Sequence, residues 1–188
     1  MSVRRRRTAE ESRAHILDIG AKRLRDLGLD GLNITGVAEE AGISHATLIH
    51  HFGSSGGMRD ALADKMTRSL IEDLVDALGA NAPPAALIQN VFEALASGGH
   101  AKLLAWRSVE GSGNAQDPSQ VAALFAKLLD TTRDVLEVED EAQARRLVYL
   151  VAIAALGHGL AGGMLAGLLG MSDAEIEDFP DWVSAKLI

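Results

Sequence analysis

Apolar residues recur at helical spacing along most of the chain, and no segment alternates between apolar and polar residues with the period of a strand. In the first segment, Ile16, Leu17, Gly20, Leu24 and Leu27 follow a three-to-four-residue spacing, which places them on one face of a helix. Aromatic residues make up 4% of the 188 residues, so the core must consist mainly of small and aliphatic side chains. The sequence therefore predicts an all-α fold, either as one domain or as a small domain joined to a larger one.

Capping signals and glycines predict the helix boundaries. A T-x-x-E box at Thr8 and Glu11 predicts the start of the first helix, and Gly28 its end. Thr35 and Ser44 are expected to cap two short helices, over residues 36–41 and 45–52. Longer helices are expected at 58–78, 84–97, 100–108, 119–136, 140–169 and 173–187, with a clear loop at 111–118.

Charge is distributed unevenly along the chain. The net charge is −8, but residues 1–60 carry nine Lys or Arg against eight Asp or Glu, whereas residues 61–188 carry nine against eighteen. Any contact with nucleic acid must therefore come from the first third, led by Arg4, Arg5, Arg6 and Arg7. No apolar stretch follows these arginines, so we expect no export signal and a cytoplasmic protein. The chain has no cysteine, which excludes disulfides and thiolate metal sites.

Three histidines in seven residues, His45, His50 and His51, raise the question of a metal site. Ligands on one helix must be three or four residues apart to point the same way. His45 and His50 are five residues apart, about 140° around a helix, and His51 is a further ~100° away. The side chains therefore diverge, and we expect no metal site.

The residues around Gly42 fit a helix-turn-helix motif instead. Val37 and Ala38 precede this glycine and Ile43 and Leu48 follow it, so apolar contacts can fix the angle between two short helices. In such a motif the second helix enters the major groove of DNA. The candidate DNA contacts are the polar side chains of that helix and the hydroxyls at two helix starts: Thr35, Ser44, His45, Thr47, His50 and His51.

Residues 37–62, VAEEAGISHATLIHHFGSSGGMRDAL, resemble the signature of the TetR family of bacterial one-component transcriptional regulators. The matching features are Thr35, Ala38, the run Ala41 to Ser44, Thr47-Leu48, His50 and Phe52. The close resemblance covers about residues 8–65, and the remainder matches in length and helical character.

The resemblance implies two domains: a three-helix DNA-binding domain over residues 1–57 and a larger helical ligand-binding and dimerisation domain over 58–188. It further implies a repressor that binds an inverted-repeat operator in double-stranded DNA. The repressor would act as a homodimer, formed through the last two long helices, and a small-molecule effector would release it.

Two departures from the family pattern affect the expected phosphate contacts. The family usually has tyrosine where this chain has Ile49, and a lysine at position 55, where this chain has serine. We hypothesise that Arg4 to Arg7 compensate as an arm that reaches phosphates or the minor groove. The alternative is that this arm is only a solubilising tail.

Two enzyme-like motifs lack the structural context that their chemistry needs. Residues 53–57 match G-x-S-x-G, but that nucleophile turn requires a preceding strand. Residues 157–162 match G-x-G-x-x-G, but too little chain follows for a further helix and strand. We therefore expect no catalytic residues, no cofactor and no enzyme, although a small helical enzyme is a third class of function to weigh.

The segment 147–171 carries no charge and is long enough to cross a membrane, at about 36 Å. Gly159, Gly163 and Gly167 also show the G-x-x-x-G spacing of transmembrane helix pairs. A tail-anchored adaptor is therefore the alternative function. His158 in mid-span favours a homodimer without a membrane. So does the amphipathic segment that follows, which starts with an S-x-x-E capping box at Ser172 and Glu175 and in which Pro180 predicts an irregularity.

The ligand pocket is the part least specified by sequence. We expect it to be mostly apolar with a few polar groups. Trp106 is a candidate wall, and Arg107 either meets an anionic ligand or pairs with Glu110. The candidate ligand-binding residues are Phe92, His100, Trp106, Arg107, Glu110, Phe125 and His158.

Overall fold

The structure, a computed structural model, describes residues 8–80, 82–96, 99–110, 118–135 and 137–187. Within them the chain is helical and contains no strand, so the predicted all-α fold is confirmed. The α-helices are α1 (Ala9–Leu27), α2 (Ile34–Ala41), α3 (His45–Phe52), α4 (Ser55–Gly79), α5 (Pro84–Ala96), α6 (His100–Glu110), α7 (Pro118–Val135), α8 (Glu141–Leu169), α9 (Asp173–Glu177) and α10 (Phe179–Leu187). One short 3-10 helix, Leu29–Gly31, joins α1 to α2.

Most of the predicted caps are confirmed, but the cap of α2 is not. The capping box of Thr8 and Glu11 begins α1, Gly28 ends it, and Ser44 accepts a hydrogen bond from the Thr47 amide to begin α3. Thr35 does not cap α2, because that helix starts two residues earlier than expected. Its cap is Asn33, whose Oδ1 accepts the Gly36 amide at 2.8 Å.

The start of α4 also differs from the prediction. The helix begins at Ser55, three residues before the expected Met58, and Ser54 caps it through the Gly57 amide at 2.9 Å. Glycines 56 and 57 therefore lie in its first turn, where an N-terminal cap offsets their weak helix propensity. The G-x-S-x-G motif thus runs from the end of α3 into the first turn of α4, without the preceding strand that a nucleophile turn requires.

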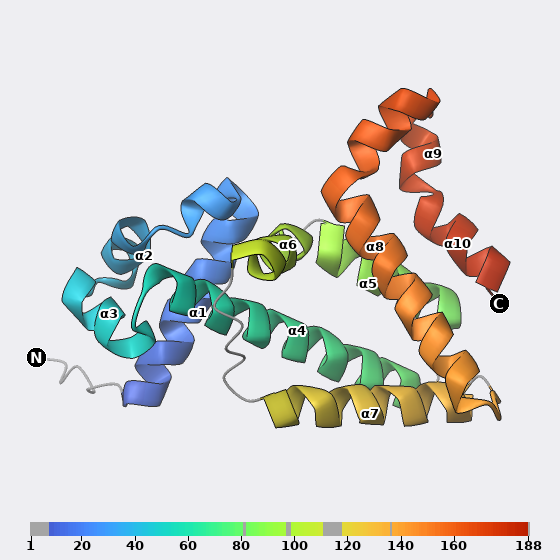
Figure 1. The fold of residues 1–188 in the computed structure, drawn as a ribbon, viewed down its shortest axis with the longest axis horizontal. Helices are drawn as coiled ribbons and strands as arrows, with labels where there is room; N and C mark the ends of the chain where they lie inside the picture. The colour runs from blue at the N-terminus through green and yellow to red at the C-terminus, as the bar shows by residue number, and fades with distance from the viewer. Residues whose placement is uncertain (1–7, 81, 97–98, 111–117, 136, 188) are drawn as a thin grey trace, which may run out of the picture.

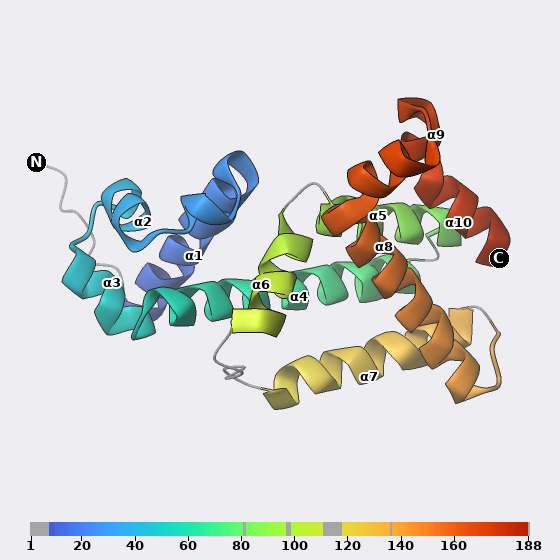
Figure 2. The same ribbon diagram turned by 45° about the horizontal axis from the view of Figure 1, so that its top comes forward.

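Helices α1, α2 and α3 gather at one end of the molecule, where they share a core with the first half of α4 (Figures 1 and 2). We call this unit the head. Its core includes Ile16 and Leu24 of α1, Leu48 of α3 and Leu62 of α4, each at most 2% exposed. Leu27, at the end of α1, is exposed. The predicted apolar faces of the short helices therefore pack as the helix-turn-helix pattern requires.

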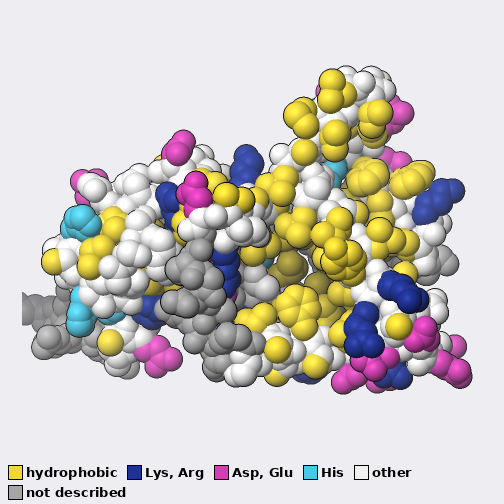
Figure 3. Space-filling view, viewed as in Figure 1, with side chains coloured by type: hydrophobic (Ala, Val, Ile, Leu, Met, Phe, Trp, Pro, Cys, Tyr) yellow, Lys and Arg dark blue, Asp and Glu magenta, His cyan; other side chains and the backbone are white. Residues whose placement is uncertain are grey.

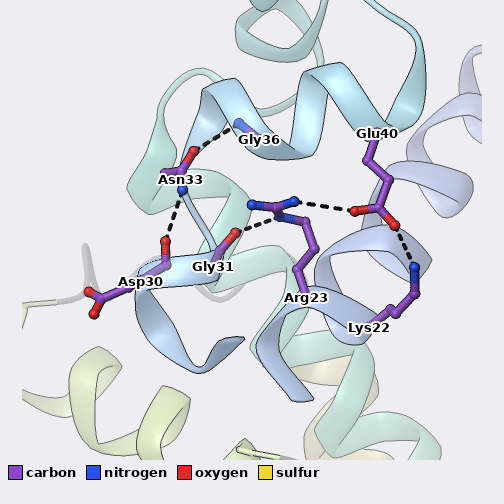
Figure 4. A network of polar contacts seen from close by, with 7 residues as sticks. All are labelled: Lys22, Arg23, Asp30, Gly31, Asn33, Gly36 and Glu40. Atoms are coloured by element: carbon purple, nitrogen blue, oxygen red, sulfur yellow. Dashed lines mark hydrogen bonds and ion pairs between the residues drawn. The ribbon is translucent and has the colours of Figure 1, made fainter. Parts of the chain in front are cut away.

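Polar contacts fasten α2 to α1 (Figure 4). Arg23 of α1 donates from Nε to the Gly31 carbonyl at 2.8 Å and from Nη1 to Glu40 at 3.2 Å. Lys22 also donates to Glu40, at 2.8 Å. A Cβ at Gly36 would lie 2.2 Å from Arg23 Nη2, so glycine is needed there for the guanidinium to lie against α2. These contacts lower the pKa of Glu40 through hydrogen bonds from Lys22 and Arg23.

Helix α4 extends from the head into the larger part of the molecule, where α7 runs beside it (Figures 1 and 2). Ile71, Leu74 and Val75 of α4 form a second core with Leu87 of α5 and Leu128 of α7. A third core joins α5, α6, α8 and α10. The larger part is therefore built around the second half of α4 and around α5.

Helix α8 crosses α5 closely, and Gly159 permits the approach. A Cβ at Gly159 would lie 3.0 Å from Ala96 Cα and 3.0 Å from the Leu95 carbonyl oxygen. Gly163 and Gly167 face open space, so only one of the three glycines with the G-x-x-x-G spacing packs against another helix in the described chain. The G-x-G-x-x-G sequence lies within α8, which excludes the strand-to-helix turn of a nucleotide-binding site.

The last expected helix, 173–187, is divided into α9 and α10 at Asp178. Ser172 and Glu175 form the predicted capping box of α9. Pro180 lies in the first turn of α10, where its missing N–H is tolerated. The predicted irregularity at Pro180 is therefore confirmed as a break between two helices.

The turn between α2 and α3 requires a left-handed residue, and this generates a first prediction. Gly42 has φ 67° and ψ 34°, and the Ile43 amide donates to the Ala38 carbonyl at 3.0 Å, which closes a Schellman motif. Gly42→Ala should destabilise the protein by about 1–2 kcal/mol, because alanine disfavours this conformation. Urea unfolding measures the difference.

Gly79→Ala is the matched control. Gly79 is helical, and a Cβ there would meet nothing within 4 Å. We expect this change to be neutral or slightly stabilising. Equal stability of Gly42→Ala and the unmodified chain would contradict the proposed role of the turn.

Candidate DNA-binding helix and ligand cavity

Helix α3 presents polar side chains to solvent and apolar side chains to the head. His45 and His50 are exposed and Thr47 is half-buried, whereas Leu48 and Phe52 are buried. Leu48 and Phe52 are four residues apart, so they lie on the same face of the helix, and this face packs against the core of the head. The residues predicted to contact DNA therefore lie on a helix whose orientation is set by its own core contacts.

The start of α3 is held by two hydroxyl groups. Ser44 Oγ accepts the Thr47 amide at 3.1 Å and lies 2.8 Å from Thr47 Oγ1. Thr35 is exposed in the first turn of α2. The starts of α2 and α3, each with a hydroxyl side chain, thus lie at the surface of the head. The free backbone amides at a helix start favour the binding of anions.

The end of α3 is held by Arg13, a residue that the sequence analysis missed. Arg13 of α1 donates from Nη1 to the His51 carbonyl at 2.7 Å, and its guanidinium carbon lies 4.3 Å from the centroid of the Phe52 ring. This pairing joins residues 38 positions apart, so no local pattern indicates it. His51 itself is half-buried and its ring lies 6.0 Å from that of His50.

The two positions that depart from the family pattern, 49 and 55, are both half-buried. Ile49 is half-buried on α3, and Ser55 is the first residue of α4. Arg4, Arg5, Arg6 and Arg7 lie outside the described residues. The arm hypothesis therefore stays a prediction.

A cavity of about 260 Å³ lies between α4, α5, α7 and α8 and reaches the start of α6. In Figure 3, hydrophobic side chains surround a hollow beside α8. Of the residues predicted to bind ligand, His100 and Phe125 line this cavity. The other lining residues are Thr67, Leu70, Ile71, Leu74, Leu78, Pro84, Leu87, Ile88, Val91, Leu95, Leu104, Leu128, Thr132, Leu147, Val148, Val151, Ala152, Leu156 and Leu187.

Phe92 and His158 lie in an aromatic cluster beside the cavity instead of in its wall. The His158 ring stacks on Phe179 at 5.5 Å between centroids, and Phe92 meets both rings edge-on. Phe92 is 2% exposed. His158 lines a second hollow, of about 280 Å³, between α8 and the α9–α10 segment. The two residues therefore belong to the packing of α8 against α5 and α10.

Trp106, Arg107 and Glu110 also lie outside the cavity, at the junction of α6 with the head. Trp106 packs on the head core, and its Nε1 donates to Glu110 at 3.0 Å. The Arg59 guanidinium of α4 lies 5.1 Å from the Trp106 ring centroid. Sequence reasoning placed these residues in the pocket because bulky and charged side chains on one helix do not indicate which neighbour they contact.

Arg107 bridges α6 to α4. Its Nη1 lies 2.5 Å from Asp64 Oδ1, and its Nε lies 3.9 Å from Asp60 Oδ1. Asp60 and Asp64 are 2% and 6% exposed. The expected pairing of Arg107 with Glu110 is therefore wrong, because the buried aspartates of α4 are the stronger partners for a guanidinium.

His100 lies at the start of α6 and faces both α4 and the cavity. Its Nε2 lies 3.1 Å from Thr67 Oγ1, and the residue is 2% exposed. Burial lowers the pKa of His100 to about 4, so the ring is neutral near pH 7. Among the described residues, no group of three or more potential ligands is placed to hold a metal ion.

Comparisons with known proteins agree on the fold. No family model matches the chain. A possible TetR family transcriptional regulator from Streptomyces coelicolor A3(2) superposes with a TM-score of 0.64 at 18% identity, covering 93% of this chain and 96% of that one. The multidrug binding protein EbrR, complexed with imidazole, superposes with a TM-score of 0.54 at 20% identity, covering 95% of each chain. The chain has the TetR-family fold.

The sequence resemblance to TetR regulators is thus confirmed at the level of the fold. A curated relative, the HTH-type transcriptional regulatory protein RaaS of Mycobacterium tuberculosis, is 31% identical over 109 residues, which is 57% of this chain and 47% of that protein. The chain spans about half the length of this relative. A protein from Rhodococcus sp. RHA1, with unknown function, superposes on this chain with a TM-score of 0.63 at 24% identity, covering 100% of this chain and 97% of that one.

The bridge from α6 to α4 in this TetR fold generates a second prediction. Arg107→Met should destabilise the protein by roughly 2–4 kcal/mol, because it removes the guanidinium from two buried aspartates while keeping the apolar stem. Urea unfolding followed by circular dichroism measures this loss.

Arg145→Met is the matched control, because Arg145 pairs with Glu141 at 3.2 Å but both side chains are more than half exposed. Its cost should stay within about 0.5 kcal/mol. Similar losses in the two variants would show that the bridge to Asp60 and Asp64 is not specifically stabilising.

The buried histidine generates a third prediction. An unfolded histidine titrates near its ordinary pKa of 6.5, whereas the folded-state pKa of His100 is about 4. The unfolded chain therefore binds a proton between these values that the folded chain does not, and stability falls as the pH drops from 6.5 toward 4. From pH 7 to pH 5, this single group should cost roughly 2 kcal/mol.

Urea unfolding of the unmodified chain and of His100→Gln at pH 7 and pH 5 isolates this contribution. The variant should lose less stability on acidification by that amount. The same pH dependence in both proteins would contradict the assignment to His100.

Proposed function

We propose that this chain is a ligand-responsive transcriptional repressor that binds an inverted-repeat operator as a homodimer. The observation that carries the proposal is the set of polar side chains on α3, with His45 and His50 exposed and Thr47 half-buried, on a helix oriented by a buried core. In a helix-turn-helix protein, such a face enters the major groove, and polar side chains contact bases and phosphates. Arg4 to Arg7 would add phosphate contacts from the N-terminus.

The surface of α8 supports a dimer. Leu160, Met164, Leu165, Leu168 and Leu169 are each at least 45% exposed along its second half. Trp182 of α10 is 54% exposed. A patch of this kind is unfavourable in water and is typical of a protein–protein interface. A two-fold dimer through α8 and the α9–α10 segment would cover it and would set two α3 helices about 34–36 Å apart.

Helix α8 is also long and apolar enough to cross a membrane, as the tail-anchored alternative requires. Its first half, however, packs against α5 and α7, and Val148, Val151 and Ala152 line the cavity. A helix with one face in a protein core and the other exposed is better suited to a second copy of the chain than to lipid. The comparison with RaaS, a transcriptional regulator, likewise favours a cytoplasmic DNA-binding protein.

Helix α4 supports control by a ligand. Its first turns pack in the head, and Leu70, Ile71, Leu74 and Leu78 line the cavity at the other end. A ligand that prefers the form with a displaced α4 would weaken operator binding, and DNA would reciprocally weaken ligand binding. EbrR, which shares the fold, is described as a multidrug binding protein, so a small organic effector is a consistent expectation.

Operator binding generates a fourth prediction. Duplexes selected from a random library by the purified protein should contain an inverted repeat. His45→Ala and His50→Ala should each weaken binding to the selected duplex by about 5- to 100-fold, because each removes hydrogen bonds to a base or phosphate. Fluorescence anisotropy at fixed salt measures the dissociation constant.

Lys102→Ala is the control, because Lys102 is exposed on α6, away from α3. It should bind the duplex as tightly as the unmodified chain. Failure to enrich any sequence at low ionic strength, with a folded protein, would overturn the proposed function.

A further inference from the structure

Within the described part of the chain, the lining of the cavity carries no formal charge. Its 21 residues include no Asp, Glu, Lys or Arg, and 18 of them are apolar. The charged residues of α4 that lie between its lining residues are Arg68, Glu72, Asp73 and Asp76, and none of them lines the cavity. A ligand that enters the cavity therefore meets aliphatic side chains and no counter-ion.

The three polar lining residues are already hydrogen-bonded within the protein. Thr132 Oγ1 donates to the Leu128 carbonyl at 2.7 Å. Thr67 Oγ1 and His100 Nε2 lie 3.1 Å apart. Because these groups pair with the protein, none of them supplies the dense set of hydrogen bonds that a buried charge needs.

The size of the cavity limits the ligand as well. Its volume of about 260 Å³ lies just below the ~300–1,000 Å³ of most small-molecule sites. Binding must then come from apolar area removed from water, which favours a compact molecule that fills the space. A charged molecule of the same size loses its hydration and gains no partner in return.

We propose that the cavity selects an uncharged, mostly apolar small molecule and rejects ligands that carry a formal charge. This inference rests on the proposed function in one respect, that the occupant of the cavity is the effector. It excludes both organic cations and organic anions such as acyl carboxylates. The cavity selects its ligand by shape and hydrophobic contact, and the hydrogen-bonded side chains of Thr67 and His100 form a polar part of its lining.

Two fluorescent probes with the same ring skeleton test the proposal. N-phenyl-1-naphthylamine is neutral, and 1-anilinonaphthalene-8-sulfonate differs from it by one sulfonate. The full-length chain should bind the neutral probe at least about tenfold more tightly, because the sulfonate would be buried without a counter-ion. Fluorescence titration at pH 7.5 gives both dissociation constants.

A cavity-filling variant separates the cavity from the exposed face of α8. Ala152 lines the cavity, so Ala152→Phe should weaken binding of the neutral probe by about tenfold or more through lost space. Ala85→Phe places the same side chain on the exposed side of α5 and should leave binding unchanged. Thermal unfolding verifies that both variants fold, and Val148→Phe replaces Ala152→Phe if the latter does not.

The outcomes distinguish the ligand class from the proposed function. A sulfonate probe that binds within about threefold of the neutral probe, and is expelled by Ala152→Phe, overturns the ligand class even if operator binding is intact. Neutral-probe binding that is insensitive to the cavity-filling variant, Ala152→Phe or its replacement Val148→Phe, overturns the ligand class too. If operator binding is absent but the preference for the neutral probe remains, the proposed repressor function is overturned. The selectivity of the cavity for uncharged ligands is then still established.

Discussion

One helix, α4, belongs to two hydrophobic cores, and the rest of the structure depends on this sharing. Its first half buries Met58 and Leu62 against the helices of the head, and its second half buries Ile71 and Leu74 against α5 and α7. A helix is stiff over this length, so a displacement at one end must appear at the other. The position of α3 relative to the larger part is therefore fixed mainly by packing along a single helix.

Helix α6 strengthens this link from the side. Leu103 is fully buried in the core of the head, while His100 and Leu104 line the cavity. His100 lies three positions before Leu103 and four before Leu104, so one side of a short helix contacts both parts of the molecule. Arg107 then anchors the end of α6 to the buried aspartates of α4. Apolar packing sets the position of the helix, and the ion pair fixes its rotation.

The sequence was sufficient for the features that depend on local spacing. The capping boxes at Thr8 and Ser172 and the turn at Gly42 each involve residues within a few positions, and the structure confirms them. Asn33 was missed as a cap because Thr35, a comparable cap residue, lies two positions later. The start of α4 was missed because glycines normally interrupt helices, whereas here Ser54 caps a helix that contains two of them.

The candidate sites were less accessible from sequence, because their partners are distant along the chain. Arg13 meets the end of α3 across 38 positions, and Arg107 meets Asp64 across 43. No spacing rule identifies such pairs. Arg107 lies three residues before Glu110, and this spacing predicted a local ion pair instead. His100 and Phe125 line the cavity, but their role in ligand binding stays a prediction, and the aliphatic side chains around them show no pattern in the sequence that marks a pocket.

The uncharged sequence of α8 from Leu147 onward follows from its two environments. Val148 and Val151 face the cavity, while Leu160, Met164 and Leu168 face outward on the next turns. A helix that is apolar on all sides is normally buried or in lipid. Under the two proposals, each side excludes charge for a different reason: a charge on the inner face would disfavour a neutral ligand, and a charge on the outer face would disfavour a second copy of the chain. Because both faces lie on one helix, a ligand that moves its inner face would also alter the geometry of the proposed dimer, and the half-site spacing with it.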